Sequence, residues 1–539
     1  MGGKQRQRDE HSRIRLDPTG VPNLDAVLGG GLPRGALTIV VGPPGSGKTT
    51  LANQMAFAAA AMGRKAIVFT ALSEPTTKLI AHLSTFSFYD GDLVGDQVQF
   101  LSLQNFLVDG LQATGEEMMS LAFRAGAGLV VLDGFRGIRG VDGDMQAARR
   151  FLFDVGTTLS TLGTTTIITS EADPRDPSFF PEATTGDVIV GLHYTLRGVQ
   201  QWRGVEIIKM RGAAPLSGLH GLGLSAAGTV VYPRLEARVT RTLNHGVIPI
   251  APPVTTLPAP AQRARFGLDE LDAALSGGVT RGTSTMLVGP LGNGKTFLSL
   301  HFALTGAEAG EPTVYVGFRE SVEQLLQKTQ PFDLGPALQR ALAPAGNLTL
   351  LRWPPVEMNP DILLEQLFEV LDRTHAQRLV VDSVDELFRA VSDYAPLRVH
   401  NYMAAMVEEL RIRGVTALFI KESNQYSNTD LAFTNEPISV LAENVIQLRQ
   451  IDERGRLHRI ITVLKTRFSA HDNATLREFV IMAPYGIRVL KPTESEPGIF
   501  TSISEGGPLD AQPAKDGNGR SHGTKNASGS SDITGEGAP

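Results

Sequence analysis

Two stretches of this 539-residue chain repeat one pattern, and any fold of the chain must accommodate both. Residues 17–49 and 263–296 each contain a Leu-Asp-x-x-Leu segment, a Gly-Gly turn, an Arg-Gly pair, an apolar run and a glycine-rich loop that ends in Gly-Lys-Thr. The lysines of the two loops, Lys48 and Lys295, are 247 positions apart. Similarity at a fixed separation indicates a duplicated domain of about 240 residues.

Short apolar runs follow one another in the same order in both copies and alternate with helical segments. The runs are Leu37–Val41, Ala66–Leu72, Gly128–Leu132 and Thr164–Thr169 in the first copy, and Thr285–Val288, Thr313–Phe318, Arg378–Val381 and Val415–Ile420 in the second. Runs without polar alternation are typical of strands buried on both faces of a parallel sheet. The alternation with helices therefore predicts an α/β fold, with a mostly parallel sheet flanked by helices in each copy.

Composition sets the expected boundaries of the two copies. Residues 251–262 are rich in proline, which indicates a stiff linker between a first domain at 14–250 and a second domain at 263–490. Residues 1–13 are polar and basic, and residues 491–539 are rich in Gly, Ser and Asp. We expect both ends to be disordered.

Both glycine-rich loops match the phosphate-binding pattern G-x-x-x-x-G-K-[ST]. Each follows an apolar run and precedes a helical segment, where backbone N–H groups and a helix N-terminus converge on phosphate oxygens. Lys48 and Lys295 are predicted to reach the β- and γ-phosphates as binding and catalytic groups, and Thr49 and Thr296 to coordinate Mg²⁺. The predicted nucleotide-binding residues of the loops are Gly42, Gly45, Ser46, Gly47, Lys48, Thr49, Thr50, Gly289, Gly292, Asn293, Gly294, Lys295, Thr296 and Phe297.

An aspartate ends the third apolar run of each copy. Asp133 follows Leu129–Leu132, and Asp382 follows Leu379–Val381. The carboxyl ends of parallel strands meet at the edge where α/β sheets bind ligands. Asp133 and Asp382 are therefore predicted to hold the Mg²⁺ shell together with the loop threonines, although either could simply cap the segment that follows.

These motifs give the chain a resemblance to the KaiC family, whose members have two RecA-like P-loop ATPase domains. The resemblance covers roughly residues 14–490. The segments that carry it are Gly20–Asp25, Gly31–Gly35, Lys209-Met-Arg-Gly212, Lys465-Thr-Arg467, Ser469-x-His471-Asp472 and Arg477-Glu-Phe479. Since phosphate loops occur in many families, the duplication and the two Lys-x-Arg elements are what make the resemblance specific.

The resemblance implies a homohexameric ring with ATP bound at the subunit interfaces. It implies that one group of cations, Lys209, Arg211, Lys465 and Arg467, reaches the nucleotide of a neighbouring subunit. It further implies nucleotide contacts by Arg459, Ser469 and His471, and an aromatic contact of Phe332 with adenine. The counterpart of that histidine in the first domain is Pro215, so this half of the first pocket departs from the family pattern.

The catalytic base also departs from the family pattern. The family carries two adjacent glutamates after the second strand of each domain, and the first of the pair is its usual base. Here Glu74 and Glu320 occupy the second position, whereas the first position holds Ser73 or Arg319. Serine is a poor base and arginine cannot act as one. Either Glu74 and Glu320 act as bases and ATP is hydrolysed slowly, or the sites hold ATP as a scaffold with little hydrolysis.

A serine/threonine autokinase of the KaiC type is a further hypothesis. Clock proteins of the family carry an adjacent Ser-Thr pair in the second domain. The matching segment here, residues 437–443, keeps Ser439 but has Val440 in the threonine position. Valine has no hydroxyl, so a two-site cycle cannot run, and Ser439 is the single candidate for phosphorylation in this segment.

Overall composition narrows the remaining alternatives. The chain has no cysteine, which excludes disulfides and thiolate metal sites. A net charge of −6 counts against a RecA-like DNA motor, the least favoured alternative. No apolar run reaches the ~18 residues of a membrane span. We therefore expect a cytoplasmic protein that works as a nucleotide-dependent regulatory switch, with its own copies and an unknown signalling protein as partners.

Overall fold

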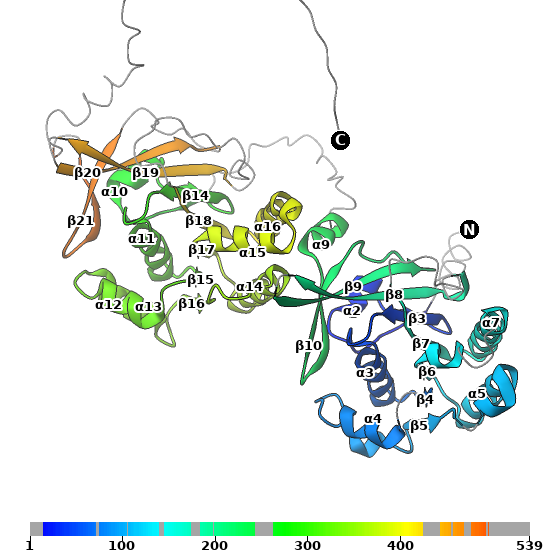
Figure 1. The fold of residues 1–539 in the computed structure, drawn as a ribbon. Coiled ribbons are helices and arrows are strands. Elements are labelled where there is room, and N and C mark those ends of the chain that lie inside the picture. Colours follow the sequence, from blue (N-terminus) through cyan, green and yellow to red (C-terminus); the bar gives the residue numbers. More distant parts are fainter. Residues whose placement is uncertain are drawn as a thin grey trace, which may run out of the picture. The chain divides into compact units, whose positions relative to one another are not determined.

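The computed structural model describes residues 15–71, 75–104, 106–139, 145–173, 184–197, 199–242, 262–423, 442–453, 456–467, 476–491 and 494. Within these residues the chain forms two nine-stranded sheets, one from each copy of the repeat (Figure 1). This confirms the predicted α/β fold with two tandem domains. The N-terminal segment, almost all of the linker and almost all of the tail lie outside the described residues, so their expected character stays a prediction.

The first sheet is parallel over its larger part and antiparallel at one end. Its order is β11 (Gly228–Tyr232), β10 (His220–Ser225), β9 (Gln200–Met210), β8 (Val188–Arg197), β3 (Leu37–Gly42), β7 (Thr165–Glu171), β6 (Leu129–Asp133), β4 (Ala66–Thr70) and β5 (Val98–Ser102). Strands from β8 to β5 are parallel, and β9, β10 and β11 are antiparallel. Its helices are α2 (Leu24–Leu28), α3 (Lys48–Ala61), α4 (Thr76–Leu83), α5 (Gly110–Ala125), α6 (Phe135–Arg139), α7 (Met145–Thr161) and α9 (Leu235–Thr242).

The second sheet repeats this arrangement. Its order is β16 (Leu348–Arg352), β15 (Thr313–Gly317), β17 (Arg378–Asp382), β18 (Thr416–Glu422), β14 (Ser284–Gly289), β19 (Asn444–Glu453), β20 (Arg456–Lys465), β21 (Arg477–Met482) and β22 (Gly486–Val489). Its helices are α10 (Asp269–Ala274), α11 (Lys295–Glu308), α12 (Val322–Thr329), α13 (Leu334–Leu342), α14 (Pro360–Thr374), α15 (Val384–Tyr394) and α16 (Val399–Ile412). Two short ribbons, β1 (Leu16–Asp17) with β2 (Leu32–Pro33) and β12 (Arg263–Ala264) with β13 (Val279–Thr280), precede the central strands.

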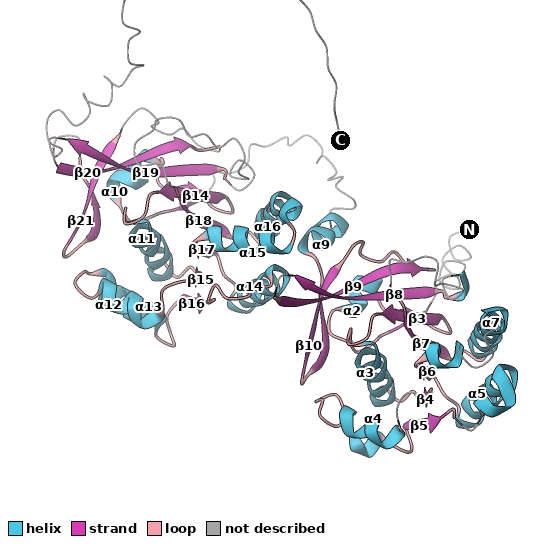
Figure 2. Cartoon of the chain, viewed as in Figure 1, coloured by secondary structure: helices cyan, strands magenta, loops and turns pink. Residues whose placement is uncertain are grey.

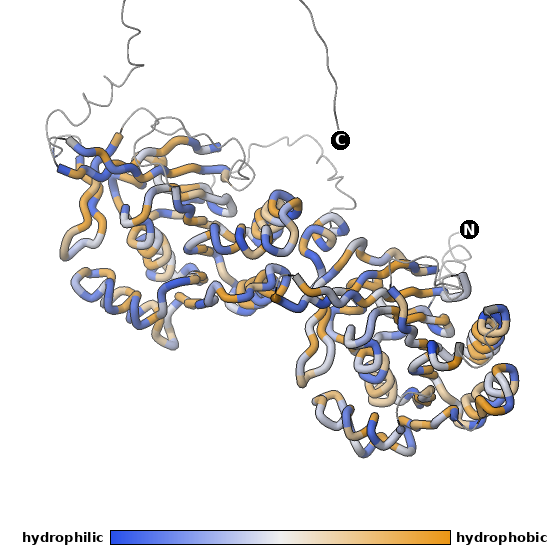
Figure 3. Tube along the Cα trace, viewed as in Figure 1, coloured by the Kyte–Doolittle hydropathy of each residue, from blue (hydrophilic) through white to orange (hydrophobic). Residues whose placement is uncertain are grey.

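Helices cover both faces of each sheet, which explains the continuous apolar runs (Figure 2). Val68 packs with α2, α3 and α4, whereas its neighbour Phe69 packs with α5, α6 and α7 on the other face. Tyr315 packs with α10 to α13, and Val316 with α14 to α16. Successive side chains of a strand point to opposite faces, so the side chains on both faces of these strands must be apolar. Figure 3 shows hydrophobic residues on strands and on helices of both domains. None of the helices in the described part of the chain is long and apolar enough to cross a membrane.

All eight predicted apolar runs are strands, with ends displaced by one or two residues. The displacement has a consequence at β7 and β18, which continue past the apolar run to Glu171 and Glu422. Glu171 pairs in register with Gly42, and Glu422 with Gly289. A carboxylate therefore lies beside the first residue of each glycine-rich loop.

Candidate nucleotide-binding sites

The two glycine-rich loops have nearly the same backbone geometry. Helices α3 and α11 begin at Lys48 and Lys295, and the preceding residues, Gly47 and Gly294, have φ angles of 99° and 86°. These values lie in the left-handed region that side chains disfavour. At Gly294 a Cβ would also lie 2.8 Å from the Ile481 side chain. Glycine is thus required where the chain turns from the loop into the helix.

The lysine of each loop is buried and lies over the loop itself. The Lys48 Nζ donates to the carbonyls of Gly42 and Pro43, both at 2.9 Å. The Lys295 Nζ makes the equivalent bonds to the second loop, at 2.8 and 2.7 Å. Burial lowers the pKa of both lysines, and nearby carboxylates act in the opposite direction. Both ammonium groups are therefore positioned within the loops that are predicted to bind phosphate.

Each predicted metal pair is assembled at the carboxyl edge of its sheet. The Thr49 hydroxyl donates to Asp133 at 3.2 Å, and the Thr296 hydroxyl donates to Asp382 at 2.9 Å. A hydroxyl and a carboxylate oxygen are hard ligands of the kind that Mg²⁺ prefers, and Mg²⁺ usually takes its other ligands from water and substrate phosphates. The residues present therefore fit Mg²⁺ bound together with a nucleotide. No cluster of three or more acidic or histidine side chains suited to a metal occurs among the described residues.

The two aspartates differ in their second hydroxyl partner. Asp133 accepts from Thr169 on β7, whereas Asp382 accepts from the buried Tyr315 on β15 at 2.9 Å. The strand registers place Ile420 at the position of Thr169 and Val68 at the position of Tyr315. Each domain therefore supplies this hydroxyl from a different neighbouring strand. Burial raises the pKa of Asp382, while the bonds from Tyr315 and Thr296 lower it.

A cavity of about 300 Å³ adjoins the second loop. Its walls are Leu291–Phe297, Tyr315, Gly317, Arg319, Glu320, Leu325, Lys328, Asp382, Ser383, Glu422 and Ile481. The Phe332 ring is not in the wall, but it packs edge-on against the Phe297 ring with 5.1 Å between centroids. In the first domain a cavity of about 350 Å³ adjoins Pro43 and Pro44, and its walls include Arg136, Glu171 and His193.

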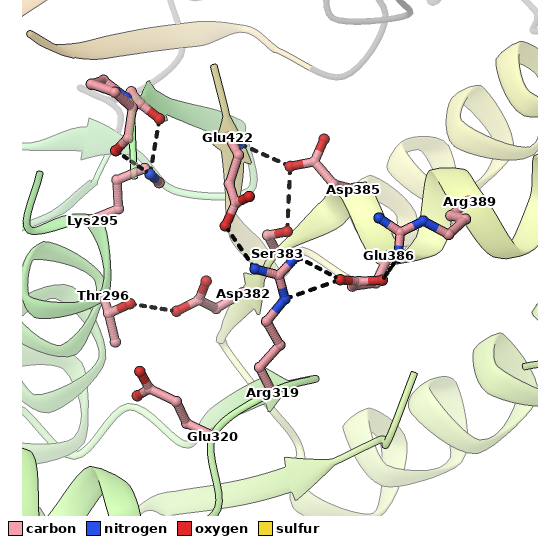
Figure 4. Close-up of polar contacts among 12 residues, drawn as sticks. Lys295, Thr296, Arg319, Glu320, Asp382, Ser383, Asp385, Glu386, Arg389 and Glu422 are labelled. Atoms are coloured by element: carbon pink, nitrogen blue, oxygen red, sulfur yellow. Dashed lines mark hydrogen bonds and ion pairs between the residues drawn. The ribbon is translucent and has the colours of Figure 1, made fainter. Parts of the chain in front are cut away.

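The predicted base of the second domain is tied to a lysine. One Glu320 oxygen accepts from Lys328 Nζ at 2.8 Å, and the other is buried with no hydrogen-bond partner among the described residues. Arg319 donates to Glu386 through two nitrogens, at 3.1 and 2.9 Å, and to Glu422 at 3.2 Å (Figure 4). Its counterpart Ser73 and the predicted base Glu74 lie outside the described residues, so the role of Glu74 stays a prediction.

Glu171 and Glu422 are candidate site residues that the sequence reasoning missed. Both line the cavities beside the loops, and both contribute to the electrostatics of the loop lysines. Their separation of 251 positions is close to that of the lysines. Following the repeat past the last apolar residue of the fourth run would have found them.

The remaining predicted contacts are not gathered at either loop. Arg211 donates to Asp187 at 3.1 Å, and the Lys465 Nζ donates to the carbonyl of Ala442 at 3.0 Å. Neither of these two side chains lines either cavity. The same holds for the other predicted cations, which are Lys209, Arg459 and Arg467. Ser469, His471 and Ser439 lie outside the described residues. Contacts to a neighbouring subunit stay a prediction for these cations.

Fold and loops together define the class of the protein: a chain with two RecA-like P-loop NTPase domains. The sequence model of the family described as the KaiC ATPase matches residues 17–236 and 264–494. The chain therefore belongs to the KaiC ATPase family, as the resemblance predicted.

Relatives of known name are distant but match along most of their length. A "Circadian clock oscillator protein KaiC" of Thermostichus vulcanus is 25% identical over 481 residues, which cover 87% of this chain and 88% of the relative. Proteins of the same name are 25% identical over 472 residues in Picosynechococcus sp. and 24% identical over 486 residues in Synechococcus elongatus. These two alignments cover 86% and 88% of this chain, and 87% and 88% of the relatives.

Proposed function

We propose that this protein binds Mg²⁺-ATP at both P-loop sites and assembles into a homohexameric ring that works as a nucleotide-dependent regulatory switch. The observation that carries the proposal is the recurrence, in both domains, of a buried loop lysine beside a bonded threonine–aspartate pair. One such constellation suits phosphate and Mg²⁺; two in one chain of the KaiC ATPase family suit two ATP per subunit. The partner that senses the ring is a signalling protein of unknown identity.

Slow hydrolysis is the proposed chemistry, with Glu74 and Glu320 as bases. Lys48 and Lys295 would stabilise charge on the phosphoryl oxygens, and the cations of the Lys-x-Arg elements would do so from a neighbouring subunit. A Glu320 that is paired with Lys328 must still accept or orient the proton of the attacking water, which favours a low turnover in the second domain.

A non-hydrolysing ATP scaffold is the second candidate, and the surroundings of Arg319 favour it for the second domain. The first position of the family's glutamate pair holds no base here. It holds the guanidinium of Arg319, which is bonded to two carboxylates. Phosphorylation of Ser439 is a further candidate that rests on the sequence alone.

Gel filtration without nucleotide, with ADP and with ATP, followed by turnover measurements on the same fractions, tests the proposal. We expect ATP and Mg²⁺ to move the protein to the size of a hexamer and the hexamer fraction to hydrolyse ATP slowly. Variants Lys48→Ala and Lys295→Ala assign the binding to each domain. A turnover equal to that of the double variant would leave the scaffold as the function, and a double variant that still binds two ATP would contradict the assignment of the sites.

A further inference from the structure

Arg319 lies in the wall of the cavity beside the second glycine-rich loop. It follows β15 by two residues and lines the same cavity as Lys295, Thr296 and Asp382. About half of its side chain is exposed (53%), so the guanidinium is open to a ligand in this cavity. In the view of Figure 4, Asp382 is bonded to Thr296 and lies between Thr296 and Arg319.

The carboxylates that hold Arg319 do not depend on it. Glu386 is buried (2% exposed), and its other oxygen accepts from Arg389 at 2.8 Å. If Arg319 moved away, Glu386 would keep a cationic partner, which avoids the high cost of an unpaired buried charge. Glu422 is only partly buried, and its backbone is fixed by a bond from its N–H to Asp385 at 2.8 Å. Arg319 can therefore exchange partners while its surroundings stay in place.

A guanidinium offers a planar set of donors that fits phosphate oxygens as well as carboxylates. The cavity already places the loop lysine for the β- and γ-phosphates and the Thr296–Asp382 pair for the metal. The group that distinguishes ATP from ADP is the γ-phosphate, so a side chain that contacts only this group changes the preference between the two nucleotides. Arg319 is a cation in the cavity wall that is bonded to neither the phosphate loop nor the metal pair.

We propose that Arg319 recognises the γ-phosphate in the second site: it leaves Glu422 and Glu386 for a γ-phosphate oxygen when ATP binds, and stays with them when ADP binds. This inference rests on the proposed binding of ATP by the second domain. A residue of the chain that holds the site, and not of a neighbouring subunit, would give it a preference for ATP over ADP. Whether Glu386 and Glu422 are bonded to Arg319 would then depend on the bound nucleotide. The residue that took the place of a base is thereby a specificity residue.

The experiment uses the full chain with Lys48→Ala, so that the second site is measured alone. Equilibrium dialysis with Mg²⁺ gives the dissociation constants of ATP and of ADP for this parent and for the added variants Arg319→Ala and Arg319→Gln. We expect the affinity for ATP to fall about tenfold, as for loss of a charge-assisted hydrogen bond, and the affinity for ADP to change by no more than about twofold. Arg319→Lys keeps the charge without the planar donor set, so its affinity for ATP is expected to lie between those of the parent and of Arg319→Ala.

Arg340→Ala is the control, because it removes an arginine of the same domain that pairs with Glu308 at 3.2 Å and does not line the cavity. We expect it to leave both affinities unchanged. The inference is overturned if the Arg319 variants bind ATP and ADP in the parent ratio, or if Arg340→Ala changes the ratio equally. If instead Lys295→Ala retains full affinity for both nucleotides, the proposed function of the second domain fails, and this outcome is separate from the others.

Discussion

Removal of one hydroxyl, in Tyr315→Phe, tests how the second domain keeps the charge of Asp382 at a buried position. The Tyr315 hydroxyl donates to the same Asp382 oxygen that accepts from Thr296, each at 2.9 Å. In the variant Asp382 keeps Thr296 as a donor, and Ser299, which also contacts Tyr315, keeps its bond to the Thr296 carbonyl at 2.8 Å. The variant therefore removes one bond to a buried carboxylate and leaves no other group without a partner.

The expected cost is about 2 kcal/mol at neutral pH, because hydrogen bonds to charged groups contribute ~1.5–3 kcal/mol. Burial raises the pKa of Asp382 and the Tyr315 bond opposes this rise, so the variant raises the pKa further. A carboxyl group whose pKa is raised in the folded state does not lower the stability of the protein below the pKa of the unfolded chain. It lowers this stability as pH rises through the folded-state pKa. The difference between the two proteins is therefore largest at neutral pH and shrinks in acid.

Urea unfolding of the full chain at neutral and mildly acidic pH measures this difference, and the Mg²⁺ dependence of ATP binding gives a second readout. The control is Tyr402→Phe, since Tyr402 is equally buried but its hydroxyl donates to the neutral carbonyl of Pro360 at 2.7 Å. We expect a cost of about 1 kcal/mol for the control, with little dependence on pH. A Tyr315 variant that costs no more than this control at neutral pH, or whose cost does not shrink in acid, would refute the reasoning.

Three further outcomes are expected. Lys48→Ala and Lys295→Ala should each abolish one of two nucleotide equivalents in a binding titration, and loss of both from a single change would contradict independent sites. Gly294→Ala should lower the unfolding free energy by about 1–3 kcal/mol and weaken phosphate binding, because it combines positive φ with a clash at Ile481; an unchanged urea midpoint would count against the turn geometry. Burial lowers the pKa of His301 to about 4, below its ordinary value of ~6.5. The contribution of neutral His301 to the unfolding free energy is therefore present above pH ~6.5 and should be lost as pH falls toward 4. His301→Gln should make the unfolding free energy depend less on pH in this range.

Much of the fold follows from the sequence because the repeat and the apolar runs act together. Eight runs in matching order allow few alternatives to two parallel sheets, and each loop motif fixes the strand before it and the helix after it. The threonine–aspartate pairs could be predicted because parallel strands bring their carboxyl ends to one edge. The duplication and the two Lys-x-Arg elements predicted membership of the KaiC family, and the match to the family model confirms it.

Other parts of the site could not be predicted, because they depend on which strands are neighbours. Glu171 and Glu422 become site residues only through their pairing with Gly42 and Gly289. Arg319 was recognised as a departure from the family pattern, but its carboxylate partners are 67 and 103 positions away in the sequence. Sequence distance of this kind leaves no local signal.

The different hydroxyl partners of the two aspartates give the domains different mechanical couplings. In the first domain the predicted metal ligand Asp133 accepts a hydrogen bond from Thr169 on β7, the strand that ends at Glu171. In the second domain its counterpart Asp382 accepts from Tyr315 on β15, the strand that leads directly into Arg319 and Glu320. A ligand that shifted the aspartate would therefore disturb β7 in the first domain and β15 in the second. Two copies of one fold would in this way respond to the same binding event through different strands.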